Sequence, residues 1–295
     1  MKELENVIDK DKIIYGALLK DYTSFKVGGP CRALVLPESP GEISAVTGFC
    51  EEKGIKYYIL GNGTNVLCPD EGYDGVVIRI GEGFDRITCE GKTVRAQAGA
   101  LMSSLANAAC EAGLSGLEFA GGIPGSVGGG IVMNAGAYDG ELRNVVVSVT
   151  ALKDGKTVVI PAEDCGFGYR TSIFQGSDLV VLEAEFELTD GNPEEIREKI
   201  NELNRRRREK QPLSYPSAGS TFRRPEGYFA GKLIEDSGLK GLSVGGAAVS
   251  DLHAGFVINK GNATASDILD LIELIRNTVY DRFKVDLKPE VKIME

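Results

Sequence analysis

The first eighty residues switch between the apolar spacing of buried strands and that of one amphipathic helix. Strands are predicted at residues 32–36, 56–60, 66–67 and 76–80. A helix is predicted from Pro40 to a stop at Gly54, with the apolar face Ile43, Val46, Phe49 and Cys50. The turn Gly61–Asn65 then lies at the carboxyl end of a strand, a usual place for a nucleotide. It lacks the third glycine and following helix of the dinucleotide fingerprint, so a plain hairpin is the alternative.

Short strand patterns dominate from about residue 81 to residue 190. They lie at 84–89, 93–98, 145–152, 157–160 and 179–188. One helix, around 101–112, interrupts them and is ended by Gly113.

The segment 119–138 contains seven glycines, yet apolar residues are threaded among them. A flexible linker would be polar, whereas buried glycines allow another group to approach the backbone closely. We interpret this segment as a loop pressed against a phosphate-bearing cofactor, because exposed N–H groups can bind an anion. A glycine-rich turn between two strands is the alternative reading.

The last third of the chain has mixed helix and strand patterns. One helix begins at Asn192-Pro193, buries Ile196, Ile200 and Leu203, and ends in the basic run 205–210. That run either complements the helix C-terminus or holds an anionic ligand. Strands are expected near 243–249 and 255–259. A final helix over 266–283, capped by Ser266, is packed through Ile268, Leu271, Ile272, Ile275 and Val279.

Length and composition restrict the possible classes of protein. The 295 residues suggest two or three domains of ordinary globular composition. A net charge of −10 argues against a nucleic-acid partner. No long apolar run predicts a membrane span, and the start lacks the features of a signal peptide, so a cytoplasmic protein is expected.

The cysteines and the single histidine restrict which metal sites the protein could hold. Six scattered cysteines without Cys-x-x-Cys spacing predict free buried thiols and no zinc site. His253 is the only histidine, which excludes a multi-histidine metal site. No metal is expected.

Six short motifs occur in a fixed order along the chain. They are 22–29 (YTSFKVGG), 60–67 (LGNGTNVL), 122–129 with 133–138 (GIPGSVGG and MNAGAY), 169–172 (YRTS), 217–222 (SAGSTF) and 287–291 (LKPEV). Together they resemble the UDP-N-acetylenolpyruvoylglucosamine reductase family, the flavoenzymes of peptidoglycan precursor synthesis. The resemblance runs from about residue 20 to the end, and the short interval between Phe222 and Gly241 resembles the form without an extra substrate-covering loop.

The resemblance implies an α+β fold with a two-part FAD-binding module of the vanillyl-alcohol-oxidase (PCMH) type and a C-terminal α+β substrate-binding domain. The expected ranges are 1–80 and 81–190 for the two FAD-binding subdomains, 191–285 for the substrate domain and 286–295 for a strand returning to the active site. Small-molecule partners only, a UDP-sugar and NADPH, and a monomeric state are expected.

The family reaction implies three catalytic residues. NADPH reduces FAD, and hydride then passes to the enolpyruvyl alkene of the substrate. By resemblance, Arg170 and Glu290 stabilise the resulting enolate and Ser220 protonates it. Without the resemblance, each of these residues has a structural interpretation. Arg170 would be a partner in a surface ion pair, Glu290 would be a solvated carboxylate, and Ser220 would be a turn or cap residue.

The resemblance also implies binding residues. The FAD-binding residues would be Tyr22, Phe25, Val27, Gly61, Asn62, Gly63, Thr64, Asn65, Gly121, Gly122, Pro124, Gly125, Ser126, Val127, Gly128, Asn134, Gly136 and Ala137. The UDP-sugar residues would be Tyr169, Arg207, Lys210, Arg224, Lys240 and His253. Both residues also have a purely structural interpretation. Lys240 could be a solvated lysine in a turn, and His253 could be a residue packed at the edge of a strand.

The chain departs from the family pattern at two places. Arg223-Arg224-Pro225 stands where the family commonly has Lys-Asn-Pro, and Glu295 replaces a usual glycine. Two rival functions remain open: another FAD oxidoreductase of the same scaffold, such as an alcohol or aldonolactone oxidase, and a non-catalytic protein that binds a nucleotide-sugar or flavin.

Overall fold

A computed structural model describes residues 1–295. The chain forms two compact units whose segments alternate along the sequence. Unit 1 comprises Met1–Tyr15, Arg32–Asn62 and Gly75–Arg207, and unit 2 comprises Gly16–Cys31, Gly63–Asp74 and Arg208–Glu295. The four domain ranges expected from the sequence remain a prediction.

The first sheet of unit 1 is the β-α-β unit expected from the sequence. Its strand order is β1 (Ile13–Tyr15), β2 (Cys31–Val35), β5 (Tyr73–Arg79) and β3 (Tyr57–Leu60). Helix α1 (Pro40–Glu52) connects β2 to β3, and β3 pairs with β5 in parallel. The Ser39 side chain caps α1 by accepting a hydrogen bond from the Glu42 N–H. Carboxyl ends of β3 and β5 therefore lie at one edge of the sheet, next to the turn that begins at Gly61.

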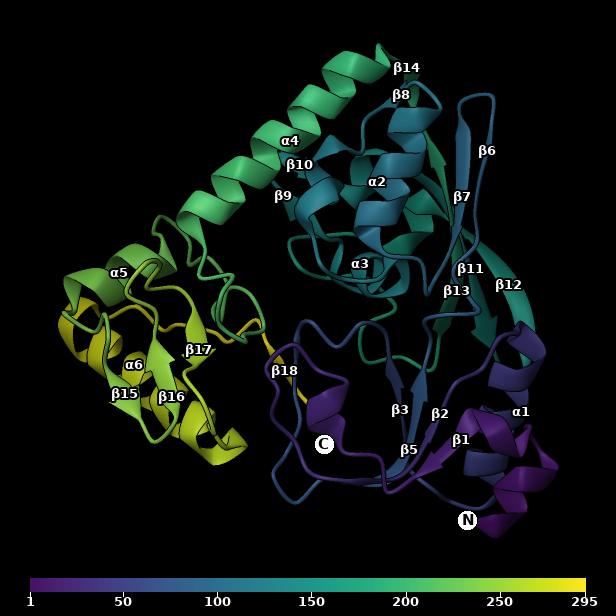
Figure 1. Ribbon diagram of the computed structural model, residues 1–295, viewed down its shortest axis with the longest axis horizontal. Coiled ribbons are helices and arrows are strands. Elements are labelled where there is room, and N and C mark those ends of the chain that lie inside the picture. Colours follow the sequence, from purple (N-terminus) through teal and green to yellow (C-terminus); the bar gives the residue numbers. More distant parts are fainter. The chain divides into compact units, whose positions relative to one another are not determined.

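The second sheet of unit 1 is antiparallel. Its strand order is β12 (Lys156–Pro161), β11 (Val146–Lys153), β13 (Val180–Glu187), β7 (Thr93–Gln97) and β6 (Ile87–Glu90). All five predicted strands are confirmed, although β6 begins three residues later than expected because Phe84 is part of a turn. Helix α2 (Met102–Glu111) and helix α3 (Val127–Met133) lie together beside this sheet (Figure 1). They enclose the largest apolar core of the molecule.

Helix α3 corrects the prediction of a continuous loop over 119–138. Ser126 caps it by accepting from the Gly129 N–H, and Asn134 ends it with a φ of 41°. Glycine is a poor helix former, but close packing requires it here. A Cβ on Gly128 would lie 2.9 Å from the Ala98 Cβ. The remaining part, η4 (Glu118–Gly122), is a 3-10 turn.

Helix α4 (Pro193–Lys210) confirms the cap and the buried face expected from the sequence. The Asn192 side chain accepts a 2.8 Å hydrogen bond from the Glu194 N–H. Ile200 lies so close to Gly121 that a Cβ there would be 2.8 Å from its Cγ2. Gly121 therefore permits α4 to pack on η4.

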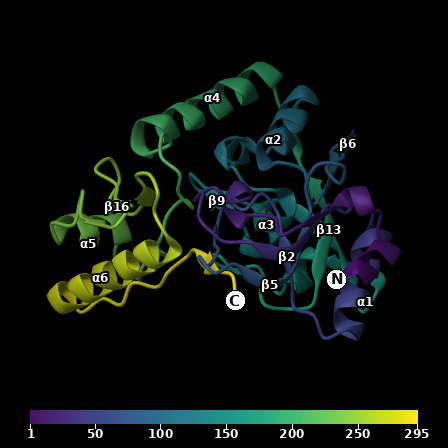
Figure 2. The same cartoon turned by 60° about the horizontal axis from the view of Figure 1, so that its bottom comes forward.

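Unit 2 has a small sheet next to two helices. Strands β15 (Ser243–Val244), β16 (Ala247–Val249) and β17 (Val257–Asn259) are antiparallel. Helix α5 (Ala230–Asp236) and the long helix α6 (Ala265–Phe283) accompany them (Figure 2). The prediction of one strand over 243–249 is wrong, because Gly245, with φ +52°, turns the chain between β15 and β16.

The predicted cap of α6 is also wrong, whereas its buried face is confirmed. Thr264, not Ser266, accepts from the Asp267 N–H, and Asp267 completes a capping box. The backbone N–H groups of Ala265 and Ser266 donate instead to the Asp70 carboxylate, at 2.7 and 3.0 Å. Asp70 thus fixes the segment 63–74 to α6 within unit 2.

Short strand pairs complete the fold. β4 (Val66–Leu67) pairs in parallel with β18 (Lys292–Ile293), β8 (Leu114–Ser115) with β14 (Thr189–Asp190), and β9 (Gly136–Ala137) with β10 (Gly140–Glu141). No helix combines the length and apolar character needed to cross a bilayer.

The prediction of free, buried thiols holds with one exception. All six thiols are free, and five are buried, but Cys89 is exposed on β6. Burial raises the pKa of Cys68 to about 12 and the pKa of Cys31 to about 11. Such thiols stay protonated and unreactive at neutral pH.

Candidate functional site

Arg170 lies in a tight turn of unit 1. Gly168 and Thr171 form the ends of this turn, with the Gly168 N–H donating to the Thr171 carbonyl at 3.0 Å. Arg170 has a φ of +55°, a strained value for a residue with a side chain. Such strain persists only where the surroundings enforce it, and it often marks a functional site.

Three side-chain hydrogen bonds enforce that turn. Arg170 Nη2 donates to the Gly136 carbonyl at 3.1 Å, and Ser172 Oγ donates to the Val132 carbonyl at 2.8 Å. Asn134 Nδ2 donates to the Gly168 carbonyl at 3.0 Å. The end of α3 therefore holds the guanidinium group in one place.

Asn134 is predicted to touch the cofactor, but its side chain is fully buried and its polar atoms are occupied. Besides Gly168, Nδ2 donates to Glu141 Oε2 at 2.9 Å, and Oδ1 accepts from the Arg143 N–H at 3.0 Å. The residue thus positions the Arg170 turn. Ser172 shares this role, which sequence reasoning misses because no local pattern links it to Val132.

The two glycine turns of unit 1 are held against each other. Asn62 Nδ2 donates to the Pro124 carbonyl at 2.6 Å. A Cβ on Gly61 would lie 2.3 Å from Ser126 Oγ, so a larger residue there would have to displace the Ser126 side chain. Two stretches that are expected to bind one cofactor therefore lie together in the structure. They are Gly61-Asn62 and the segment 124–126. A surface of bare main chain held this way suits a diphosphate.

The other predicted cofactor positions in unit 1 lie along the same stretch. The Gly125 carbonyl accepts from the Met102 N–H at 3.0 Å, and the Val127 N–H donates to the Ala100 carbonyl at 2.7 Å. Val127 and Gly128 are buried in the packing of α3. Gly136 and Ala137 form β9.

Arg207 lies at the end of α4, beside Gly122. A Cβ on Gly122 would be 3.3 Å from Arg207 Cδ and 2.5 Å from Asn204 Oδ1. Burial lowers the pKa of the Arg207 guanidinium, and the nearby Tyr138 opposes this. Gly122 therefore makes room for the side chains of α4. Tyr169 is 53% exposed and stacks under Arg170, with the guanidinium carbon 5.3 Å from the ring centroid.

Ser220 and Glu290 both belong to unit 2 and lie on neighbouring segments. The Glu290 N–H donates to the Thr221 carbonyl at 2.8 Å, and Phe222 forms a bridge with Pro289. Asn65 Nδ2 donates to the Glu290 carbonyl at 3.2 Å. The structure therefore brings together a predicted proton donor, a predicted carboxyl partner and one end of the glycine turn. Ser220 is exposed and Glu290 is half-buried.

The remaining cofactor residues of unit 2 surround Gly63. A Cβ on Gly63 would lie 2.1 Å from the Tyr22 carbonyl oxygen, and the Ser24 N–H donates to the Gly63 carbonyl at 3.0 Å. Phe25 and Val27 are only 1% and 3% exposed and belong to the core of unit 2. Their side chains stabilise the fold, so only main-chain atoms there are available to a ligand. Thr64 and Asn65 are half-buried.

Lys240 and His253 lie close together in unit 2. Lys240 Nζ forms a 2.8 Å ion pair with Glu235, and both charges act on the imidazole. His253 Nδ1 accepts from the Gly255 N–H at 3.0 Å, and the ring meets Phe256 edge-on. Burial is the main effect that lowers the pKa of His253, and the positive charge of Lys240 lowers it further.

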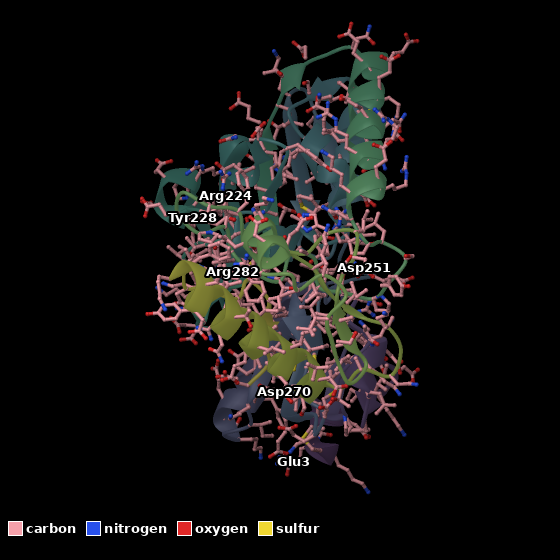
Figure 3. All side chains as sticks on the ribbon, turned by 90° about the vertical axis from the view of Figure 1, so that its left-hand side faces the viewer. Glu3, Arg224, Tyr228, Asp251, Asp270 and Arg282 are labelled. Carbon is pink, nitrogen blue, oxygen red and sulfur yellow. The ribbon has the colours of Figure 1, made fainter.

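Arg224 and Tyr228 lie next to each other on unit 2 (Figure 3). The Arg224 Nε donates to the Tyr228 carbonyl at 3.3 Å, and its guanidinium carbon is 4.0 Å from the centre of the Phe229 ring. Phe229 is 62% exposed. Lys210, at the end of α4, is exposed.

Comparison with known proteins identifies both parts of the chain. Residues 30–160 match the model of a FAD binding domain, and residues 211–294 match that of the UDP-N-acetylenolpyruvoylglucosamine reductase C-terminal domain. The chain is 51% identical to the UDP-N-acetylenolpyruvoylglucosamine reductase of Clostridium novyi, over 99% of this chain and 95% of that protein.

Comparison with solved structures indicates the same family. The UDP-N-acetylenolpyruvylglucosamine reductase of Thermus caldophilus is 38% identical, with a TM-score of 0.82 over 95% of this chain and 98% of that one. The Bermuda grass isoallergen BG60 shares only the fold, at 14% identity and a TM-score of 0.52 over 65% of this chain and 44% of that one. The expected fold class, a FAD-binding module of the PCMH type followed by an α+β C-terminal domain, is confirmed. The chain belongs to the UDP-N-acetylenolpyruvoylglucosamine reductase family.

Proposed function

We propose that this protein reduces UDP-N-acetylglucosamine enolpyruvate to UDP-N-acetylmuramate, with FAD as bound cofactor and NADPH as reductant, in peptidoglycan precursor synthesis. The observation that carries the proposal is the identity of 51% to a curated reductase over nearly the full length of both chains. We expect the protein to act as a cytoplasmic monomer.

The residues that would hold FAD in unit 1 fit this cofactor. Gly61 packs directly on the Ser126 side chain, which brings the main chain of the turn at residue 61 close to that of the segment 124–126. Asn62 locks the two turns together through the Pro124 carbonyl. When bound and reduced by NADPH, the flavin would supply the hydride for the alkene. Residues Gly63–Asn65 and Tyr22 would contribute from unit 2.

Arg170 would stabilise the charge that develops on the enolpyruvyl group. Its guanidinium is permanently charged and can bind a carboxylate through two N–H groups. The hydrogen bond to the Gly136 carbonyl and the enforced turn support this role, because a fixed cation stabilises developing charge without reorganising. Glu290 would assist on the same group. Its main chain is anchored at both the N–H and the carbonyl.

Ser220 would donate the proton that completes the reaction. An enolate carbon is a strong base, so even a serine hydroxyl can protonate it once positioned. Thr221 is buried, and its Oγ1 accepts from the Val257 N–H at 2.9 Å, which leaves the exposed Ser220 as the better donor. Lys240, His253, Arg207, Lys210, Arg224 and Tyr169 are proposed to bind the UDP-sugar.

A visible spectrum of purified protein tests the proposal. A flavin spectrum that NADPH bleaches without oxygen, and that the enolpyruvyl UDP-sugar restores, is the expected result. Bleaching with no response to that substrate would favour another FAD oxidoreductase of this fold. A yellow protein that NADPH cannot bleach would be a flavin-binding protein without this activity. Acid-precipitated protein should release its flavin, since no histidine precedes His253 to tether it.

A further inference from the structure

Two cations flank Glu290 in unit 2. The segment 221–223 runs antiparallel to 288–290: the Arg223 N–H donates to the Lys288 carbonyl at 2.9 Å, and Phe222 is bridged to Pro289. Successive side chains of an extended segment point to opposite faces. Phe222 is 3% exposed and packs into the core, so Arg223 lies on the face of this pair that Glu290 shares.

Lys292 joins the same group of charges. Burial is the largest effect on this ammonium and lowers its pKa. The Arg223 charge lowers the pKa further, and the Glu290 charge raises it. All three groups therefore lie within electrostatic reach of one another.

One donor in this pair of cations has no partner in the protein. Arg223 Nε is buried and makes no hydrogen bond. Leaving a buried donor without a partner is unfavourable, and more so when the donor is charged. A bound anion could accept a hydrogen bond from Arg223 Nε and would also face the Lys292 ammonium.

We propose that Arg223 and Lys292 bind the carboxylate of the enolpyruvyl group, an inference that rests on the proposed function. The cluster adjoins Glu290 and the segment that begins at Ser220, the residues assigned to the enolpyruvyl carbons. The substrate diphosphate is separated from that end by the sugar ring. The cations also explain how a substrate carboxylate can approach Glu290 without repulsion, and they would stabilise the negative enolate.

Ligand binding to the oxidised, FAD-loaded enzyme tests this assignment. Two ligands are titrated by calorimetry: UDP-N-acetylglucosamine enolpyruvate, and UDP-N-acetylglucosamine, which lacks the carboxylate. Arg223→Gln and Lys292→Gln should each weaken the first ligand by about 10-fold or more and change the second less than about 2-fold. Lys288→Gln is the matched control, because Lys288 is exposed on the same segment and only its carbonyl is used. It should change neither ligand.

Each other outcome overturns the assignment. Equal weakening of both ligands would place the diphosphate at the cluster, and no weakening would remove the site. Slower flavin reduction by NADPH, with unchanged binding of the enolpyruvyl ligand, would mean that the cluster binds NADPH phosphate. If Arg223→Gln does not fold, three other variants test the assignment. Lys292→Gln should still weaken the carboxylate ligand. The charge-preserving Arg223→Lys and Lys292→Arg should retain the preference for that ligand. A wild-type protein that prefers this ligand but never turns it over would refute the proposed function alone.

Discussion

The backbone N–H of Glu290 donates a 2.8 Å hydrogen bond to the carbonyl oxygen of Thr221, the residue that follows Ser220. Two residues far apart in sequence are thereby fixed on neighbouring segments of unit 2. The contact uses main-chain atoms only, so changing either side chain leaves it intact. Kinetic effects of substitutions at Ser220 and Glu290 should therefore report their chemistry and not a displaced backbone.

Ser220→Ala should separate the two half-reactions. NADPH reduction of the flavin should stay near the wild-type rate, whereas oxidation of the reduced flavin by the enolpyruvyl substrate should slow by about 10²-fold or more, since a proton donor is lost. Stopped-flow spectra measure both steps. Ser217→Ala serves as control, because the Ser217 contact with Ser24 uses its carbonyl. Equal slowing of both half-reactions would disprove the role of Ser220.

Arg170→Lys should likewise affect only the second half-reaction. Lysine keeps the charge but loses the planar fork and the bond to Gly136, so a loss of about 10²-fold is expected. Lysine would adopt the same strained φ as arginine, and Ser172 and Asn134 still hold the turn, so the free energy of unfolding should fall by only about 1 kcal/mol, the loss of one hydrogen bond. Arg143→Lys is the control, because this side chain pairs with Glu141 at 2.6 Å in the same unit. An unchanged rate for Arg170→Lys would remove Arg170 from the enolate site.

Local patterns predict those features that neighbouring residues determine. The buried faces of α1, α4 and α6 follow from apolar spacing, and the Asn192 cap follows from a short polar signal. Helix α3 escapes such patterns because its glycines are poor helix formers, and only contacts with Ala98 and Met102 explain them. The sequence does carry a signal for Thr264 as the cap of α6, because Asp267 follows three residues later, as in a capping box, whereas Leu269 stands three residues after Ser266. The contact of the Ala265 and Ser266 N–H groups with Asp70, which is distant in the chain, has no such local signal.

The candidate site is indicated by motifs, not by geometry. The order of six motifs indicates the family, and comparison confirms it. What the motifs do not reveal is how the parts are held. Asn134 matches a cofactor position by motif, yet its side chain fixes Gly168 in the Arg170 turn. The charges around Glu290 depend on pairing between 221–223 and 288–290, which no local pattern encodes.

A double-mutant cycle tests the contact between the two glycine turns. Gly61→Ala should destabilise the protein by about 1–3 kcal/mol, because its Cβ would overlap Ser126 Oγ, 2.3 Å away. Ser126→Ala should cost about 1 kcal/mol through loss of the α3 cap. The double variant should cost less than the sum, since Ser126→Ala removes the overlapping atom. Denaturant unfolding measures the free energy of unfolding of the wild type and the three variants. Strict additivity of the two single losses would contradict the contact.

The cap of α6 can be tested with two nearby substitutions. Thr264→Ala should cost about 1 kcal/mol, because it removes the side-chain oxygen that accepts from the Asp267 N–H at 3.0 Å. Ser266→Ala should cost less than about 0.5 kcal/mol, since its hydroxyl makes one 3.3 Å contact with Asp70 at an exposed position. Thermal unfolding of both variants provides the comparison. A larger loss for Ser266→Ala would restore the cap predicted from sequence.

The single histidine should make folding stability depend on pH. Burial lowers the pKa of His253 below its usual 6.5, and the Gly255 N–H donates to the neutral ring. The unfolded chain therefore binds a proton at higher pH than the folded one, so stability is complete above about 6.5 and falls as pH drops through the folded pKa. His253→Asn should flatten this part of the stability curve between about pH 7 and pH 5.5. One imidazole resonance reports the titration without ambiguity, and a midpoint at or above 6.5 would contradict the burial of this ring.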